Sequence, residues 1–363
     1  MKKKEATLTS DKKVATRLGE SIKLGVDVHI DKYVVVMKID GSAPSRPRSF
    51  APEDFLAWAA ELRRKCAALH SCYEAGPFGY GLHRKLQALG VVNYVIRPVS
   101  WDSYGKRVKT DGRDAAQMAL CLDGYLRGND RSFSVVRVPS QEEERLRSVT
   151  RQRQSLVKER QRLAMKARSH VMYYGGRLKG EWWKPRRWKA LQESLEDHLT
   201  ALLEPLRTLI LAIGEQIDAV EKRMAEMKSP PLPRGMGLVT CQQIEREIGD
   251  WSRFDSGRKV GSYAGLCPRE DASGERRFQG SISKHGNPRL RTLLVECAWL
   301  LLKWNPGYAG IRKWRDKLLD DKLTKASGKK IVVAIARRFA VDWWKVRTGR
   351  IAAEDLGLIM KSS

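Results

Sequence analysis

The sequence predicts an α/β domain at the N-terminus and an all-α remainder, made of a long antiparallel coiled coil and a mainly helical C-terminal domain. Strand-like and helix-like segments alternate over residues 21–137. Apolar residues then recur at helical spacing up to about residue 227, and a Pro- and Gly-rich break follows. We therefore expect a basic tail at 1–20, the α/β domain at 21–137, a coiled-coil domain at 138–230 and a C-terminal domain at 231–355.

The first domain opens with two β-branched runs in IKLGVDVHIDKYVVVMKIDG, residues 22–41, joined by a turn around His29 to Asp31. This pattern predicts a β-hairpin. A third strand is expected near PRSFA, residues 47–51. Helical spacing and β-rich runs then alternate, which predicts helices at 52–69 and 77–90 and strands at 70–76 and 91–98. Together these segments indicate a mixed α/β sheet.

Four acids occupy chemically suggestive places on this sheet. Asp27 lies inside the first strand, where an unpaired charge is costly to bury, and Glu74 ends a later strand immediately before Ala-Gly. Asp111 and Asp114 begin a helix three residues apart, so their side chains share one face. A simpler interpretation makes Asp111 an N-cap and Asp114 a first-turn acid favoured by the helix dipole.

Convergence of these four acids at one end of the sheet would create a site for a pair of Mg²⁺ ions, the arrangement used in phosphodiester cleavage. The acids of the helix start are surrounded by cations that would hold phosphate: Lys106, Arg107, Lys109 and Arg113. The six histidines and six cysteines show no zinc-type spacing. Any metal is therefore expected to be carboxylate-held Mg²⁺ or Mn²⁺, and the cysteines to be reduced thiols.

The charge balance points to a polyanionic partner. The 363 residues include 69 Lys and Arg against 42 Asp and Glu, a formal net charge of +27. Nucleic acid is the first candidate, and a membrane surface is the weaker one. The basic start has no apolar run behind it, and no segment offers the roughly 18 apolar residues of a membrane span. We expect a cytoplasmic protein with no membrane partner.

Two long helices are predicted in the middle of the chain. From about Gln141 to His170 a narrow apolar stripe repeats every seven residues on a basic surface. A second stripe should pair with it as an antiparallel coiled coil, and Pro205 should kink the second helix or mark its beginning. The second stripe consists of Leu202, Leu206, Leu209, Ile213, Ile217, Val220, Met224 and Met227.

Between these helices, aromatic and basic residues are interleaved. Trp182, Trp183 and Trp188 alternate with Lys184, Arg186 and Arg187. This composition suits stacking on bases and binding of phosphates. Aromatic residues that cap the end of the helix pair explain the same pattern equally well.

The C-terminal domain begins with a turn at Gly235 and Gly237 that precedes an amphipathic helix. The turn resembles a helix-hairpin-helix element, whose backbone amides bind phosphate, and a simple packed turn is the alternative. Residues 267–286 form a polar, basic, glycine-punctuated loop of the kind that approaches a DNA backbone. Trp343 and Trp344 are expected to be buried in a closing helix.

In combination, GVDVH, YEAG and KTDGRDA resemble the RuvC-like motifs of the DEDD transposases of the bacterial insertion-sequence-one-ten family, which includes the Piv-type DNA invertases. Residues 232–270 and 272–294 resemble the C-terminal transposase domain of the same family, so the resemblance spans most of residues 21–345. It implies a ribonuclease H fold for the first domain. It also implies a catalytic metal-binding tetrad, carried onto Asp27, Glu74, Asp111 and Asp114.

The resemblance further implies a nucleophilic serine, which corresponds to Ser273 in ASGERR, with Ser281 and Ser283 as rivals. It implies cutting and rejoining of donor and target DNA through a phosphoserine link, guided by a structured bridge RNA. Composite active sites in a homodimer or homotetramer are expected, because the tetrad and the serine lie on separate domains. Phosphate contacts are expected from Arg276, Arg277, Lys284, Arg289 and Arg291, although a solvated basic face would look the same.

Two other function classes fit parts of the sequence. A junction-resolving nuclease of the same fold would use the tetrad and water, and would not need Ser273. A noncatalytic nucleic-acid-binding protein would tolerate loss of Asp27 as well. A site-specific DNA invertase is a further alternative within the resemblance itself.

Overall fold

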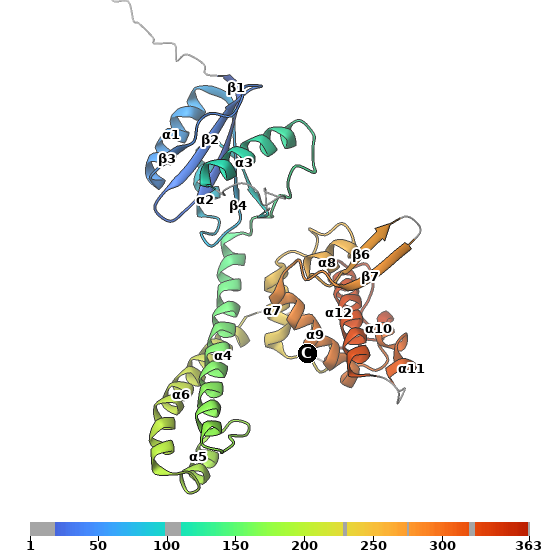
Figure 1. The fold of residues 1–363 in the computed structure, drawn as a ribbon. Helices are drawn as coiled ribbons and strands as arrows, with labels where there is room; N and C mark the ends of the chain where they lie inside the picture. The colour runs from blue at the N-terminus through green and yellow to red at the C-terminus, as the bar shows by residue number, and fades with distance from the viewer. Residues whose placement is uncertain (1–18, 99–109, 228–230, 274–275, 319–323, 362–363) are drawn as a thin grey trace, which may run out of the picture. The chain divides into compact units, whose positions relative to one another are not determined.

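The computed structural model describes residues 19–98, 110–227, 231–273, 276–318 and 324–361. The chain divides into two compact units, Met1–Val138 and Pro139–Ser363. Each unit is built around its own buried core. Figure 1 shows the N-terminal unit as a sheet with helices and the second unit as helices with a β-hairpin.

The N-terminal unit contains a mixed five-stranded sheet with the order β3-β2-β1-β4-β5. β1 pairs antiparallel with β2 and parallel with β4, and β4 pairs parallel with β5. This topology is consistent with the expected RuvC-like domain. The strands are β1 (Gly19–Val28), β2 (Tyr33–Ile39), β3 (Arg48–Phe50), β4 (Cys66–Glu74) and β5 (Val92–Ile96), and the helices are α1 (Pro52–Arg64), α2 (Gly81–Ala88) and α3 (Asp111–Leu126).

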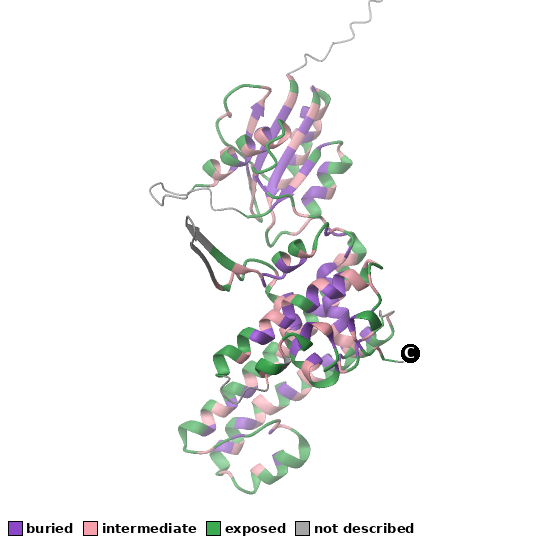
Figure 2. Ribbon diagram, turned by 90° about the vertical axis from the view of Figure 1, so that its right-hand side faces the viewer, coloured by how far each residue is buried: buried purple, intermediate pink, exposed green. Residues whose placement is uncertain are grey.

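The central strand β1 is covered on both faces, and Figure 2 shows buried residues along the strands of the sheet. On one face Ile22, Leu24 and Val26 pack with apolar residues of α1 and α2. The residues between them, at 23, 25 and 27, point to the opposite face because strand side chains alternate. On that face α3 contacts β1, β2 and β4. The alternation thus directs Asp27 to the side of the sheet that α3 covers.

Gly25 allows α3 to lie unusually close to β1. A Cβ atom at this position would lie 2.0 Å from the carbonyl oxygen of Ala115 and 2.6 Å from the amide nitrogen of Ala119. Only glycine leaves room for a helix backbone at that distance. The first turn of α3, which carries Asp111 and Asp114, is therefore held beside the end of β1.

A buried ion cluster lies on the same face of the sheet. Lys23 and Lys38 are direct cross-strand partners in the β1–β2 pair. Their ammonium groups lie 3.2 and 3.3 Å from the carboxylate of Asp123 on α3, and all three residues are buried. Both lysines also donate to the carbonyl oxygen of Asp40. Buried charges of this kind persist only where they are paired and hydrogen-bonded.

The predicted hairpin and the third strand are confirmed, and the amide of His29 donates to the carbonyl of Lys32 in the hairpin turn. The prediction of a helix up to residue 69 is wrong, because α1 ends at Arg64 and β4 begins at Cys66. Parallel pairing with β1 from Gly19 onward overrides the helical spacing of this segment. Leu69 is accordingly buried in the core of the sheet.

In the second unit, α4 (Gln141–Tyr173) and α6 (Asp197–Ala225) pack against each other, and α5 (Pro185–Gln192) lies between them in the sequence. α4 starts with a capping box, in which Ser140 and Glu143 exchange hydrogen bonds between side chain and backbone. Pro205 lies inside α6, so it does not mark the beginning of the helix. A coiled-coil supercoil for this pair remains a prediction.

The apolar stripe of α6 is partly displaced from the predicted one. Leu202 and Leu209 are 41% and 52% exposed, whereas the adjacent Leu203 and Ile210 are fully buried. Both positions of each pair are apolar, so the spacing alone fits either stripe. Packing with buried residues of α4 such as Ala167 selects the stripe that contains Leu203 and Ile210.

The C-terminal part of this unit is mainly helical, as expected, and its helices share one core. Trp343 and Trp344 are buried there, which confirms the prediction. Gly235 has φ +86° and its Cα faces the indole of Trp304, which supports a packed turn. The elements are α7 (Leu238–Ile248), α8 (Gly257–Tyr263), β6 (Pro268–Ser273), β7 (Arg276–Ile282), α9 (Pro288–Trp304), α10 (Ala309–Arg312), α11 (Arg315–Leu318), α12 (Lys325–Arg347) and a 3-10 turn (Glu354–Leu356).

The buried carboxylate of Glu247 joins α4, α7 and α9. The guanidinium of Arg151 donates to both of its oxygens, at 2.9 and 3.0 Å. The side-chain amide of Asn287, the N-cap of α9, donates to it at 2.8 Å. Burial alone would raise the pKa of Glu247, but these hydrogen bonds outweigh it and hold the pKa below the ordinary 4.5.

All six cysteines are free thiols in this structure. Within the described residues, none of the helices combines the length and the apolar composition needed to cross a membrane.

We predict that Gly25→Ala destabilises the N-terminal unit, because the new methyl group would displace the backbone of α3. The expected loss is about 3 kcal/mol, at the upper end for overpacking. Urea denaturation monitored by circular dichroism measures it. Gly41→Ala is the matched control, since nothing lies within 4 Å of the Cβ it would add. Equal stability of the two variants would contradict the close contact of α3 with β1.

We predict that Glu247→Gln costs about 2 kcal/mol at neutral pH, because it removes charge-assisted hydrogen bonds. The pKa of Glu247 is lower in the folded state, so its contribution is complete above pH 4.5 and is lost as the pH falls through the folded pKa. The difference in unfolding free energy between variant and wild type should therefore shrink below pH 4.5. Glu226→Gln, at an exposed position, is the control. It should change neither the free energy of unfolding at neutral pH nor its dependence on pH.

Candidate metal and nucleic-acid site

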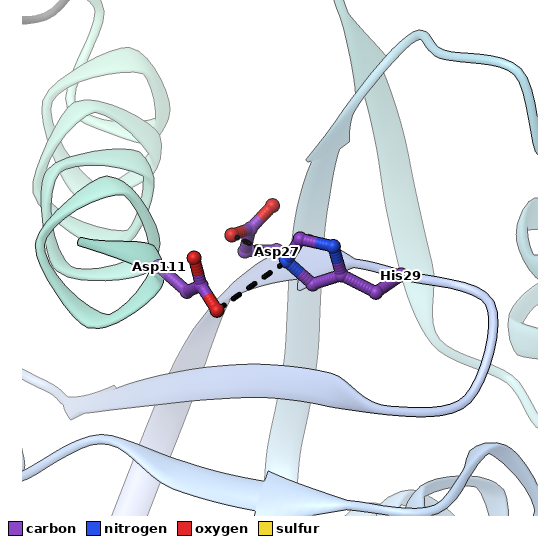
Figure 3. Close-up of side chains that lie close together, drawn as sticks. All are labelled: Asp27, His29 and Asp111. Atoms are coloured by element: carbon purple, nitrogen blue, oxygen red, sulfur yellow. Dashed lines mark hydrogen bonds and ion pairs between the residues drawn. The ribbon is translucent and has the colours of Figure 1, made fainter. Parts of the chain in front are cut away.

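Three side chains meet where β1 ends and α3 begins. Single ligand atoms of Asp27, His29 and Asp111 all lie within 4.8 Å of one another. Figure 3 shows the side chains of Asp27, His29 and Asp111 turned toward one another, with a dashed line from the imidazole to Asp111. Its Nε2 lies 3.2 Å from Oδ2 of Asp27 and 3.5 Å from Oδ2 of Asp111. The ammonium group of Lys32 lies 3.3 Å from the same oxygen of Asp111.

The electrostatics of this cluster are those of crowded carboxylates. Burial raises the pKa of Asp27 above its ordinary 3.8, and the negative charges of Asp111 and Asp114 raise it further. The nearby imidazole of His29 lowers it in part. Asp27 is thus partly removed from water and faces two like charges. A cation placed among these oxygens would relieve both costs.

The structure places Asp114 and Glu74 near this end of the sheet as well. Asp114 lies one turn after Asp111 on α3, and its charge acts on Asp27. Glu74 ends β4, and its neighbour Tyr73 pairs with Val26 of β1. Cys72 contacts α3 through a hydrogen bond to Met118, so by alternation Glu74 faces the same side as Asp27. Glu74 and Asp114 are not among the three residues whose ligand atoms lie within 4.8 Å.

The interpretation of Asp111 as a simple N-cap is wrong. Thr110 is the N-cap of α3, and Asp111 is the first helical residue. The carboxylate of Asp111 is directed to His29 and Lys32. Its place in the first turn is still favourable for an acid, but its contacts belong to the cluster.

His29 is the residue that sequence reasoning missed, since the histidines form no cluster along the chain. Its signal in the sequence is the spacing Asp-x-His in GVDVH, which places both side chains on one face at the strand end. Its proximity to Asp111 depends on how α3 packs against the sheet. The Asp-x-His spacing carries no information about that packing.

The donor set fits a divalent cation. Carboxylate oxygens are the ligands that Mg²⁺ and Mn²⁺ prefer, and an imidazole nitrogen suits Mn²⁺ better than Mg²⁺. The side chains are 25–44% exposed, so an ion can reach them from solvent. Asp27, Asp111 and His29 could hold the ion, and the participation of Glu74 and Asp114 remains a prediction.

The expected serine lies in the second unit. Ser273 is the last residue of β6, and its backbone pairs with Arg276 in the hairpin β6–β7. The side chains of Ser273, Arg276 and Arg277 lie outside the described residues. Ser281 and Ser283 lie at the other end of the hairpin, where the amide of Ser283 donates to the carbonyl of Cys267.

The predicted phosphate contacts differ in their surroundings. Lys106, Arg107 and Lys109 lie outside the described residues, whereas Arg113 and Lys284 are exposed. Arg291 donates to the carbonyl oxygens of Ala264 and Lys284. Arg289 donates to Gln154 of α4. The last two arginines therefore also support the packing of their own unit.

The tryptophans between α4 and α6 cap the helix pair. Trp182 and Trp188 are 1% and 5% exposed and pack with apolar residues of both helices. The prediction that they stack on bases is wrong for these two buried rings. Lys184, Arg186 and Arg187 are exposed around them, so phosphate binding by these cations remains a prediction.

Two family models match the chain. Residues 24–174 match a transposase model of the DEDD, IS110 type. Residues 233–310 match the transposase IS116/IS110/IS902 family. The first match covers Asp27, Glu74, Asp111 and Asp114, and the second covers Ser273.

Similar proteins are found along most of the chain. A putative transposase, y4rJ of Sinorhizobium fredii, is 32% identical over 348 residues, 85% of each chain. The transposase for insertion sequence element IS1111A of Coxiella burnetii is 25% identical and covers 77% of this chain and 78% of its own. The pilin gene-inverting protein of Moraxella bovis is 31% identical over 118 residues, 32% of this chain and 35% of its own. The chain belongs to the IS110 family of insertion-sequence transposases, enzymes that cut and rejoin DNA.

Proposed function

We propose that this transposase cuts and rejoins DNA through a phosphoserine intermediate at Ser273, assisted by Mg²⁺ or Mn²⁺ that its acids hold. The observation that carries the proposal is the meeting of Asp27, His29 and Asp111 at one end of the sheet, within the segment that matches the DEDD transposase model. A DEDD domain of this type uses a divalent metal. The identity of the ion and the role of the serine are the proposed steps.

Asp27, Glu74, Asp111 and Asp114 would hold the ion, and His29 lies within reach of the same position. When bound, the ion would neutralise charge on the scissile phosphate and make its phosphorus more electrophilic. The residues of the chain orient the site and bind the DNA. The carboxylates orient the site, and exposed cations such as Arg113 and Lys284 bind neighbouring phosphates.

In the cutting step, Oγ of Ser273 forms a bond to phosphorus and loses its proton. The bond between phosphorus and one strand breaks, and the departing oxygen takes up a proton to become a hydroxyl group. In the rejoining step, the hydroxyl of a second strand attacks the phosphoserine, and Oγ of Ser273 recovers its proton. One phosphodiester is exchanged for another, so no ATP is required. The chain accordingly carries no GxxxxGK[ST] phosphate loop.

We infer that a structured bridge RNA pairs with donor and target DNA and selects the sites. The support is the family and the net charge of +27, which suits a protein that holds several polyanions at once. We further infer that the active sites are shared between subunits of a dimer or tetramer, because the acids and Ser273 belong to different compact units.

Inversion of a DNA segment is the second candidate, favoured by the likeness to the pilin gene-inverting protein. The same cutting and rejoining chemistry would serve it. The two functions differ in whether the rejoined ends lie in one DNA molecule or two, which the sequence of the products reveals.

We predict that Asp27→Asn weakens Mn²⁺ binding at least tenfold, because it removes one charged ligand from the cluster. Isothermal titration calorimetry of the full chain measures the affinity. Asp31→Asn is the control, because Asp31 is an exposed acid of the same hairpin outside the cluster. Unchanged affinity in Asp27→Asn would remove Asp27 from the ligand set.

We predict that a covalent protein–DNA adduct forms when the protein is incubated with Mg²⁺, its element-end DNA and RNA from the flanking noncoding region. After denaturation, gel electrophoresis reveals the adduct. Ser273→Ala and Asp111→Ala should both lose it, whereas Ser283→Ala should keep it. Cleaved ends without an adduct, at the same rate in Ser273→Ala, would make the enzyme a hydrolytic nuclease of the junction-resolving type.

A further inference from the structure

A groove of about 880 Å³ lies between the hairpin β6–β7 and the helix α12. Its floor is apolar and includes Leu266, Ile282 and Val333. Four cations of α12 line it: Lys329, Lys330, Arg337 and Arg338. Among the described residues, those that line the groove carry no carboxylate.

The buried carboxylate of Asp342 fixes the position of the Arg338 side chain. Its Nε donates to Oδ2 of Asp342 at 2.7 Å, and the hydroxyl of Tyr308 donates to the same oxygen at 2.8 Å. Asp342 and Tyr308 are both fully buried. A guanidinium has five N–H donors, so this anchor leaves others for a ligand. A buried carboxylate that fixes an arginine at a groove is a feature of a preorganised anion site.

The combination of cations with an apolar floor selects the ligand class. A single nucleic-acid strand presents both phosphates and unpaired bases, so it can place charge on the cations and base surface on the floor. A duplex turns its base faces inward and offers mainly phosphates to such a groove. The charge and the floor together therefore favour a single strand.

The position of the groove along the hairpin indicates which nucleic-acid strand the groove would bind. Pro268 and Ser281 line it at the base of the hairpin, and Ser273 lies at the far end of β6. The five-residue step along β6 from Pro268 to Ser273 spans about 17 Å, which is the length of a few nucleotides. We propose that this groove binds the single-stranded DNA that flanks the cut made at Ser273. The choice of DNA rests on the proposed function.

Ser281 acquires a role in this arrangement. It is exposed at the groove beside the cations, so its hydroxyl can donate to a phosphate of the bound strand. Ser281 is thus assigned to strand binding, and the attack on phosphorus is left to Ser273.

The test compares two double variants of the full chain that each remove two exposed lysines. Lys329→Ala/Lys330→Ala removes charge from the groove, and Lys313→Ala/Lys317→Ala removes the same charge from another surface of the same unit. Fluorescence anisotropy measures their affinity for one labelled sequence in three forms: single-stranded DNA, duplex DNA and single-stranded RNA. The measurement is made without divalent metal, so that no cutting occurs.

We expect the groove variant to bind single-stranded DNA about tenfold more weakly, with the slope of log affinity against log salt reduced by about 1.4. The control variant should stay within about twofold of wild type. An equal loss in both variants, a loss as large on duplex DNA, or a loss confined to RNA would each overturn the proposal.

The outcome is independent of the phosphoserine chemistry. If wild type forms no covalent adduct but the groove variant still loses single-stranded DNA, the proposed function fails and the groove stands as a DNA-strand site. If the adduct forms and the groove variant binds like wild type, the groove inference fails and the proposed function stands.

Discussion

The close approach of α3 to β1 at Gly25 determines where the acids of the N-terminal unit meet. A strand and a helix normally lie a side chain apart, but here the helix backbone occupies the space of a missing Cβ. The first turn of α3 is thereby brought to the carboxyl end of β1, and Asp111 reaches the neighbourhood of Asp27. The family match over residues 24–174 contains both sides of this contact.

Crowding of carboxylates has an electrostatic cost that the unit offsets with polar contacts from its own hairpin. His29 and Lys32 come from the hairpin turn next to Asp27, and both contact Asp111. They stabilise the acids in the absence of an ion. An ion held here would compete with Lys32 for the carboxylate of Asp111, and an exposed ion pair of this kind costs little to open.

The sequence was sufficient for the parts of the fold whose signals are local. The hairpin, the strand end at Glu74 and the helix start at Asp111 follow from alternation and from turn residues near each element. The parts that depend on packing were not accessible. The two adjacent apolar stripes of α6 differ only in which one contacts α4. The first residues of β4 have helical spacing in the sequence, and only their pairing with β1 makes them a strand. His29 joins the candidate site for the same reason, since only the packing of α3 brings Asp111 to it.

The ion cluster of Lys23, Lys38 and Asp123 has a consequence for the alignment of β1 with β2. A slip of β1 against β2 by one residue would turn one of the lysines toward the apolar face that packs on α1 and α2. That misaligned pairing would bury an ammonium group in hydrocarbon and deprive Asp123 of one of its two lysine partners. Apolar strands alone tolerate such slippage far better. The cluster therefore penalises wrong alignments of the hairpin, and because Asp27 lies four residues further along β1, it also fixes which residue reaches the metal-binding end of the sheet.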